Sequence, residues 1–341
     1  MTSLDSGRFA LSVGVAAAML AGCGGSQPPI GTPNAMPQSR AIATHAEHGG
    51  SWMLPEKPAY KVTKPLLYVT NDSGNGVTVY HASAKDPSPL ATISDGLDFP
   101  SGGCIDSQGT LYVANQPVSN GGWISEYPLG KTKASAFIKD GISTPAFCAI
   151  DGNGNLWVTN ISTSNVTEYL HGSKKPHTVI TNGLDYPVGI AIDDSGSLYV
   201  ANRPVSGSPN VAIYGRGSKT PTRTITSGVI YPVGIAVDAH GTLYVTNEQL
   251  SGSRSAGNVE EYRAGRSKPS RKISFNGLYH PLAVTVGKNG WLYVAVWPEY
   301  TNSNPFAVLE YRPRTVDPSS RMVTESVSYP QGLAYYPPLL P

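Results

Sequence analysis

Short apolar runs joined by small polar turns recur along most of the chain. Residues 231–247, YPVGIAVDAHGTLYVTN, hold two such runs on either side of a turn that contains Gly241. Short runs of β-branched and aromatic residues separated by a few turn residues are typical of β-hairpins. The pattern therefore predicts antiparallel strands. No window shows the i, i+3, i+4 spacing of apolar residues that an amphipathic helix needs.

The hairpin is repeated at a nearly constant interval. A proline opens each copy, and successive prolines are 42 to 49 residues apart: Pro100, Pro145, Pro187, Pro232, Pro281 and Pro330. A tyrosine segment and a short β-rich segment follow each hairpin; the tyrosines are Tyr80, Tyr127, Tyr169, Tyr214, Tyr262 and Tyr311. Four strands in about 40–50 residues are typical of one blade of a β-propeller. We label the strands of a blade a to d, from the proline onward.

The first and last copies are incomplete in complementary ways. The first copy begins with strand b at 66–70, and the last copy ends with strand a at 329–336. Pairing these two segments leaves no unpaired sheet edge at either end. Residues 65–341 are therefore expected to form an all-β, six-bladed propeller of four-stranded antiparallel blades, closed by its C-terminal strand.

The N-terminal residues have a different composition. Arg8 precedes an apolar run at 9–20 that is too short to span a bilayer, as in secretory signals, so residues 1–22 are expected to be a signal peptide. Residues 23–64 are rich in Gly, Pro, Ser and Ala and predict a flexible tether. The sequence LAGC at 20–23 resembles the lipobox of bacterial lipoproteins, which implies that Cys23 is lipidated. The alternative is an ordinary secretory signal that is cleaved nearby.

Two further cysteines, Cys104 and Cys148, lie in strand a of neighbouring blades. Export would permit a disulfide if their Cα atoms come within about 7 Å. We expect two buried free thiols, and the disulfide is the alternative.

The two ends of the blades differ in sequence. The b–c loops and d–a connections share one end, the loop rim, and the a–b and c–d turns share the other, the turn rim. Because the b–c loops vary in length and sequence while the a–b turns are short and uniform, the loop rim is the expected binding face. Its candidate ligand-binding residues are Asn71, Asn115, Asn160, Asn202, Asn247, Trp297 and His280. Each asparagine ends a strand b, where an alternative role is to bond the neighbouring backbone and start a turn.

Acidic residues that repeat in register are expected to be structural, since a site needs only one copy. They precede the strand-c tyrosine in four blades: Glu126, Glu168, Glu261 and Glu310.

Basic residues concentrate in the c–d turns, which hold 16 of the 25 lysines and arginines of a chain with a net charge of only +2. The principal ones are Lys174, Lys175, Lys219, Arg223, Arg266, Lys268 and Arg271. Within these turns only Asp86 and Asp317 oppose them. Such a face is expected to attract an anionic envelope polymer or lipid within a Debye length of about 8 Å. A solubilising coat of charge is the alternative.

The motif P-x-G-I-A-x-D-x-x-G-x-L-Y-V-x-N at 187–202 and 232–247 resembles the NHL repeat and the wider six-bladed group of SMP-30/gluconolactonase-like proteins. The matching residues are Pro187, Gly189, Asp193, Gly196, Tyr199, Val200 and Asn202, with Pro232, Gly234, Asp238, Gly241, Tyr244, Val245 and Asn247. NHL repeats usually have Asp where this chain has Asn after the LYV run.

Resemblance to propeller enzymes implies where catalytic or metal-binding residues would lie in this chain. Gluconolactonase-like enzymes hold a divalent cation with Glu, Asn and Asp at the channel mouth. The strand-a positions just after the proline offer no carboxylate here: Ser101, Ala146, Val188, Val233, Leu282 and Gln331. Streptogramin-lyase-like propellers use a histidine on the loop rim, where His280 is the one that we place. No catalytic set and no cofactor are therefore predicted, with Ca²⁺ or Mg²⁺ as the alternative.

Taken together, the sequence favours an exported propeller, lipid-anchored in a bacterial cell envelope, that acts as a non-catalytic binding or scaffold module. An outer-membrane location is compatible with this reading. The expected partners are a protein, glycan or small molecule on the loop rim and an anionic surface on the basic turns, with no specific nucleic acid and with membrane contact through the lipid alone. The alternative is a divalent-cation-dependent hydrolase or lyase of the gluconolactonase or streptogramin-lyase type.

Overall fold

A computed structural model describes residues 62, 64–82, 85–117, 121–248, 257–275, 279–298, 305–318 and 322–338 of the chain. The predicted signal peptide, Cys23 and all of the predicted tether except Val62 and Lys64 lie outside these residues. The regular structure within the described ranges consists of β-strands. A search of the same ranges finds no helix with the length and apolar character needed to cross a membrane.

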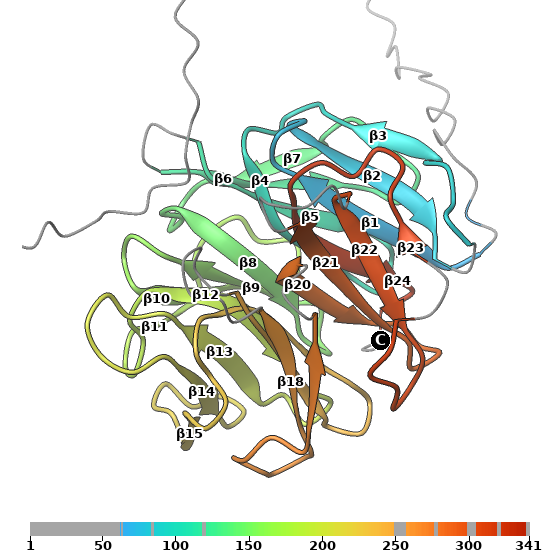
Figure 1. The fold of residues 1–341 in the computed structure, drawn as a ribbon. Coiled ribbons are helices and arrows are strands. Elements are labelled where there is room, and N and C mark those ends of the chain that lie inside the picture. Colours follow the sequence, from blue (N-terminus) through green and yellow to red (C-terminus); the bar gives the residue numbers. More distant parts are fainter. Residues whose placement is uncertain are drawn as a thin grey trace, which may run out of the picture. The chain divides into compact units, whose positions relative to one another are not determined.

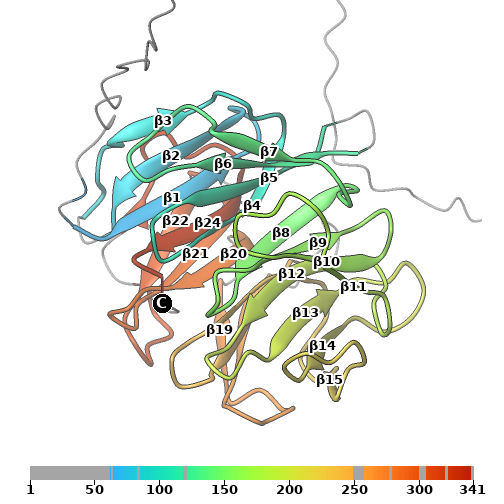
Figure 2. The same cartoon turned by 180° about the vertical axis from the view of Figure 1, so that it is seen from behind.

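The strands form six four-stranded antiparallel sheets, the blades of the propeller (Figures 1 and 2). Blade 1 contains β24 (Pro330–Tyr336), β1 (Leu66–Asn71), β2 (Gly76–His81) and β3 (Ala91–Ile93). Blade 2 contains β4 (Pro100–Ile105), β5 (Leu111–Asn115), β6 (Trp123–Tyr127) and β7 (Ala136–Ile138). Blade 3 contains β8 (Pro145–Ile150), β9 (Leu156–Asn160), β10 (Asn165–Tyr169) and β11 (Thr178–Ile180).

The second half of the ring repeats this order. Blade 4 contains β12 (Pro187–Ile192), β13 (Leu198–Asn202), β14 (Asn210–Tyr214) and β15 (Arg223–Ile225). Blade 5 contains β16 (Pro232–Val237), β17 (Leu243–Asn247), β18 (Asn258–Tyr262) and β19 (Arg271–Ser274). Blade 6 contains β20 (Tyr279–Val286), β21 (Leu292–Pro298), β22 (Ala307–Tyr311) and β23 (Met322–Val323).

The blades close into a ring, as the sequence predicts. Each inner strand contacts the inner strand of the next blade, in the order β24, β4, β8, β12, β16, β20 and back to β24. The closing blade pairs the two ends of the chain, with Leu66 opposite Tyr336 and Val69 opposite Leu333. Blade 1 is also bonded to blade 6. The Tyr80 hydroxyl of blade 1 donates at 2.6 Å to the carbonyl of Glu325, which lies just after β23 of blade 6. The six-bladed, all-β fold and its closure by the C-terminal strand are therefore confirmed.

The strand-c tyrosines join neighbouring blades. Tyr80, Tyr127 and Tyr169 are fully buried, and each donates its hydroxyl at 2.6 Å to a backbone carbonyl in the connection that leaves the preceding blade. Tyr214 and Tyr262 make the same bond at 2.8 and 2.7 Å. Burial raises the pKa of Tyr80 and of Tyr127 to about 12, so both hydroxyls remain donors at neutral pH. These bonds explain why tyrosine recurs at this position.

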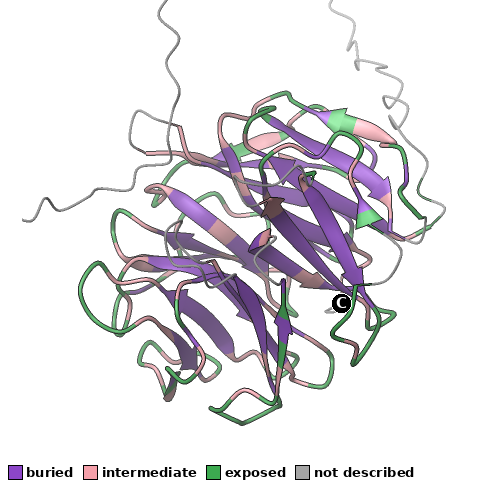
Figure 3. Cartoon of the chain, viewed as in Figure 1, coloured by how far each residue is buried: buried purple, intermediate pink, exposed green. Residues whose placement is uncertain are grey.

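Glycine lets the inner strands approach one another near the axis. A Cβ at Gly234 would meet the Leu282 carbonyl of the next blade at 2.5 Å, and one at Gly189 would collide with the Val233 carbonyl. A side chain at either position would therefore push two blades apart. Figure 3 shows the result: the strands are largely buried, and the exposed residues gather in the turns and loops.

The expectation of two free thiols is wrong in this structure. Cys104 on β4 and Cys148 on β8 form a disulfide, with a Cα–Cα distance of 5.6 Å. β4 and β8 are neighbouring inner strands in contact, and their packing brings Cys104, four residues after Pro100, within bonding reach of Cys148, three residues after Pro145. The bond links blades 2 and 3.

The two ends of the central channel differ: one is filled by side chains and the other holds a cavity. On the loop-rim side, Ala146, Val188, Val233 and Leu282, the residues that follow the strand-a prolines, pack together into an apolar plug. On the turn-rim side a cavity of about 160 Å³ lies between all six inner strands and is lined mainly by aliphatic side chains. The plug forms the floor of the loop rim.

Candidate binding face at the loop rim

A repeated backbone bond fixes two side chains per blade at the loop rim. The residue after the strand-b asparagine donates its N–H to the carbonyl of the residue before the strand-a proline, as from Arg203 to Tyr186 at 3.1 Å and from Glu248 to Tyr231 at 2.9 Å. Asp72, Gln116 and Ile161 donate in the same way. The backbone is uniform at these positions in five blades, and in blade 6 the strand pairing extends through Trp297. The side chains after strand b differ in every blade: Asp72, Gln116, Ile161, Arg203, Glu248 and Trp297.

The five asparagines form part of this scaffold. Their side chains are almost completely buried. In blade 5, the Asn247 Oδ1 accepts the Ile230 and Tyr231 N–H groups at 2.9 and 3.3 Å, and its Nδ2 donates to the Gly228 carbonyl and to Asn258 Oδ1 at 2.9 Å each. The other four asparagines bond the same connection in their own blades: Asn71, Asn115, Asn160 and Asn202. Their side-chain amides hold the d–a connections against strands b and c.

Four residues before the strand-a prolines have a backbone conformation that side chains rarely adopt. Phe99, Thr144, Tyr186 and Tyr329 have φ between 48° and 52°. A non-glycine residue in this region costs about 1–2 kcal/mol and persists only where the surroundings enforce it. The asparagine bonds supply that constraint, and the conformation directs these side chains at the rim.

Blades 4 and 5 bring together a charged and aromatic cluster. The Arg203 guanidinium carbon lies 5.2 Å from the ring centroid of Tyr186 and 4.5 Å from that of Tyr231. Arg203 Nη1 is also 3.8 Å from Glu248 Oε2, and the two side chains are 19% and 22% exposed. Burial raises the pKa of the Glu248 carboxyl, while the positive charges of Arg203 and His280 oppose the shift. Arg203 is thus held in a fixed orientation, with part of its surface open to a ligand.

The other side of the rim carries a second polar group and an aromatic group. Burial raises the pKa of the Asp72 carboxyl, and the Gln331 side chain opposes this shift. Tyr329 packs against Trp297 and Phe306, with ring centroids 5.2 and 4.4 Å apart. Trp297 Nε1 donates to the Pro330 carbonyl at 3.2 Å.

The structure places His280 and Trp297 on the predicted rim. His280 is buried and lies opposite Trp297 in the β20–β21 register. Arg203, Glu248, Asp72 and Gln116 were missed by the sequence reasoning. The signal that could have found them is the position after the repeated asparagine, where every blade has a different residue.

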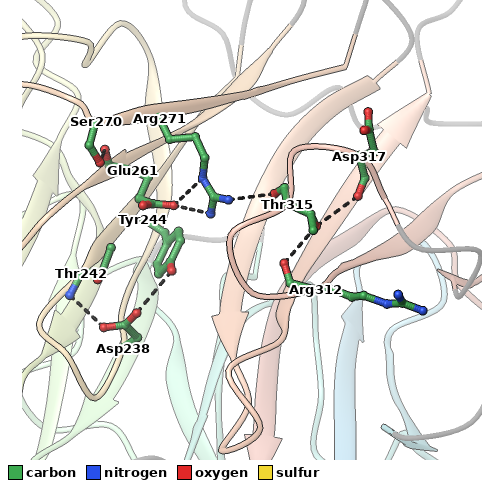
Figure 4. A network of polar contacts seen from close by, with 9 residues as sticks. All are labelled: Asp238, Thr242, Tyr244, Glu261, Ser270, Arg271, Arg312, Thr315 and Asp317. Carbon is green, nitrogen blue, oxygen red and sulfur yellow. Dashed lines mark hydrogen bonds and ion pairs between the residues drawn. The ribbon is translucent and has the colours of Figure 1, made fainter.

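The basic residues of the turn rim do not behave alike. Lys174, Lys175, Lys219, Arg266 and Lys268 are exposed, and Arg223 is half-buried. Arg271 pairs with Glu261 and donates from Nη1 to the Thr315 carbonyl at 3.1 Å, so that it joins blade 5 to blade 6 (Figure 4). Aspartates also occupy a–b turns at this rim: Asp106, Asp151, Asp193 and Asp238. The turn rim is therefore of mixed charge.

Among the residues that the structure describes, no group of three or more His, Cys, Asp or Glu is arranged to hold a metal ion.

Comparison with known proteins shows that this chain is similar in fold to several solved structures. No protein-family model and no curated protein matches this chain. The structure titled as a nidogen/laminin complex contains a chain with a TM-score of 0.62 and 18% identity, over 80% of this chain and 97% of that one. A protein of unknown function from Bacteroides caccae has a TM-score of 0.59 and 12% identity, over 80% and 99%. Hydrazine synthase from Kuenenia stuttgartiensis has a TM-score of 0.52 and 17% identity, over 64% of each chain.

Proposed function

We propose that this protein is a non-catalytic binding or scaffold module that engages its partner through the loop rim. The observation that carries the proposal is the contrast between a repeated scaffold and the single-copy side chains that it displays. Asparagine, proline and the backbone bond recur from blade to blade, whereas Arg203, Glu248 and Asp72 each occur once at their position. Because packing requires the repeated residues, the residues that differ are free to specify a ligand.

The composition of this face favours a protein as the partner. Around the Arg203 cluster, Val205 is 91% exposed and Ile230 is 52% exposed. Tyrosine, tryptophan and arginine are the residues that most often dominate binding energy at protein interfaces. The nidogen/laminin structure is, by its title, a complex between proteins, and it supports this choice by analogy of fold. The motif resemblance to NHL and SMP-30/gluconolactonase-like propellers supports the same six-bladed platform.

The proposed location is the bacterial cell envelope, reached by export and kept by a lipid on Cys23. The disulfide between Cys104 and Cys148 supports export, since disulfides persist in oxidising compartments and are rare in the cytosol. Mass spectrometry of the membrane-extracted protein tests the anchor. A lipidated Cys23 at the mature N-terminus is expected, and a mature chain that begins elsewhere without lipid would contradict it.

A secondary contact is proposed between the exposed lysines of the turn rim and an anionic envelope surface. Such an attraction weakens as salt is added. Binding to anionic vesicles should therefore fall between low and high ionic strength, and retention that does not change with salt would refute the contact.

A capture experiment tests the main proposal. The mature protein without lipid is immobilised and exposed to envelope extracts, in parallel with Arg203→Ala and with Arg266→Ala, a matched control on the opposite rim. The wild type and Arg266→Ala should retain a common partner that Arg203→Ala loses. Equal capture by all three would remove the loop rim as the binding face. EDTA is included in one arm because loss of capture there would favour the cation-dependent hydrolase or lyase.

A further inference from the structure

A cleft of about 510 Å³ opens at the turn rim between blades 3 and 4. Trp157, Glu168 and Thr178 of blade 3 form one wall, and residues 215–219 of blade 4 form the other. Gly215 follows the strand-c tyrosine of blade 4, where the other blades have histidine, proline, leucine or arginine. A Cβ at Gly215 would meet only the Thr222 side chain of the same blade, at 3.7 Å, and the glycine itself lines the cleft.

Glu168 is a largely buried residue that lines this cleft, and its carboxylate has no partner among the described residues. The residue is 9% exposed, and its carboxylate makes no hydrogen bond or ion pair with the described residues. A carboxylate on a largely buried residue normally has a cation or hydrogen-bond donors beside it. Here the cleft, and not the protein, occupies the space where that partner would lie.

In blade 5 the carboxylate at the equivalent position has a cationic partner. Glu261 is the equivalent residue, and Arg271 stands directly opposite it in the β18–β19 register. Arg271 Nε donates to Glu261 Oε2 at 2.7 Å, and its Nη1 reaches the Thr315 carbonyl of blade 6 (Figure 4). One guanidinium therefore satisfies the carboxylate and bridges two blades.

Blade 3 has the carboxylate but not the guanidinium. In the β10–β11 register the residue opposite Glu168 is Thr178, whose short side chain is uncharged and supplies no cation there. Ser218 of blade 4 occupies the position that Thr315 has in blade 6, four residues after the strand-c tyrosine, and it lines the cleft. The cleft thus lies where blade 5 holds the head group of Arg271.

We propose that this cleft binds the guanidinium group of a ligand, with Glu168 as its anionic partner. A planar guanidinium suits a carboxylate through two parallel hydrogen bonds, and the Trp157 ring adds an aromatic surface beside it. Four acidic residues line the cleft, Asp151, Glu168, Asp193 and Asp194, against the two cations Arg216 and Lys219. The balance favours a cation.

The two lining cations also indicate what the rest of the ligand carries. Neither Arg216 nor Lys219 forms an ion pair in the part of the chain that the structure describes. They belong to the blade 4 turn, on the opposite wall from Glu168. A ligand with a guanidinium at one end and a carboxylate at the other would satisfy both walls. Free arginine and a peptide ending in arginine share this chemistry.

Calorimetric titration of the mature propeller with free L-arginine tests the site. The wild type should bind it, and Glu168→Gln should weaken binding about tenfold or more. Thr178→Arg should abolish binding, since it supplies the guanidinium from within the chain, while the near-isosteric control Thr178→Val should keep it. Citrulline, the neutral counterpart of arginine, should not bind, and agmatine, which lacks the carboxylate, should bind more weakly than arginine.

A second arm distinguishes the two sources. Binding of a peptide with a C-terminal arginine, without binding of free arginine, would support the site and assign it to a peptide. Arginine and peptide that both fail to bind the wild type, or that bind Glu168→Gln equally well, would overturn the proposal. Arginine binding that appears only after Lys219→Met would also overturn it, because Lys219 would then be the natural partner of Glu168. Melting curves confirm that each variant is folded, and none of these results depends on the loop rim.

Discussion

Replacing Asn247 separates a structural role of the strand-b asparagines from a ligand-facing one. The side chain is 0% exposed and makes four hydrogen bonds, of which three are to backbone groups of the d–a connection. A hydrogen bond contributes about 1 kcal/mol net, and buried groups left without a partner add to the loss. Asn247→Ala should therefore lower the free energy of unfolding by about 3 kcal/mol. At about 2 °C for each kcal/mol in a domain of this size, the melting temperature should fall by about 6 °C.

Urea unfolding followed by tryptophan fluorescence measures this loss, with an unchanged m-value showing that the folded and unfolded states are otherwise alike. The exposed Asn153 is the matched control, and Asn153→Ala should change stability by less than about 0.5 kcal/mol. Asn247→Asp adds a second test, since its carboxylate would face the Gly228 carbonyl and Asn258 Oδ1. Burial and these oxygens would raise the folded-state pKa, so the variant should become less stable as the pH rises above about 4. If Asn247→Ala kept wild-type stability but lost partner capture, the asparagines would face the ligand and the structural reading would be refuted.

Three further predictions follow from the blade contacts and from the loop rim. Tyr80→Phe at the closing boundary should cost about 1–2 kcal/mol, as much as Tyr214→Phe between blades 3 and 4, because each hydroxyl donates one buried bond, at 2.6 and 2.8 Å. Urea unfolding that showed a loss for Tyr214→Phe alone would contradict closure. The double variant Cys104→Ser/Cys148→Ser should lose about 2–4 kcal/mol in the same assay, since the bond closes a loop with a sequence separation of 44, and unchanged stability would argue against the bond. Burial raises the pKa of Glu248 above its ordinary value of 4.5, so wild-type stability should fall as the pH rises through the folded-state pKa. Glu248→Gln should lack this decline in melting curves across pH, and parallel profiles would show that Glu248 is not the cause.

The fold was predictable because the residues that pack the blades recur at nearly the same position in every repeat. Proline opens the inner strand of five blades and pairs within its own blade, as Pro187 does with Asn202. Tyrosine stands at or next to the end of each strand c, and in five blades its hydroxyl bonds the connection from the preceding blade. The complementary ends at 66–70 and 329–336 then specify which strands must pair. The disulfide was not predictable in this way. It depends on how far neighbouring inner strands are staggered near the axis, and spacing along the chain does not give that stagger.

The candidate site was predictable only in its location. Variable b–c loops indicate the loop rim, and His280 and Trp297 lie there. Arg203 and Glu248 carry no motif, and their pairing depends on the approach of blades 4 and 5. The sequence also does not show that Glu168 lacks a cationic partner. This becomes visible only when its strand pairing with Thr178 is compared with the bond between Glu261 and Arg271.

Both rim assignments depend on the closed ring, and amide hydrogen exchange on β24 tests that ring most directly. The amides of Leu333 and Tyr335 lie in the strand that pairs with β1, and those of Ile235 and Val237 lie in the equivalent inner strand of blade 5. A closed ring predicts that all four exchange equally slowly, through global unfolding. If Leu333 and Tyr335 exchanged at the rate of an unstructured peptide while Ile235 and Val237 stayed protected, the ring would be open.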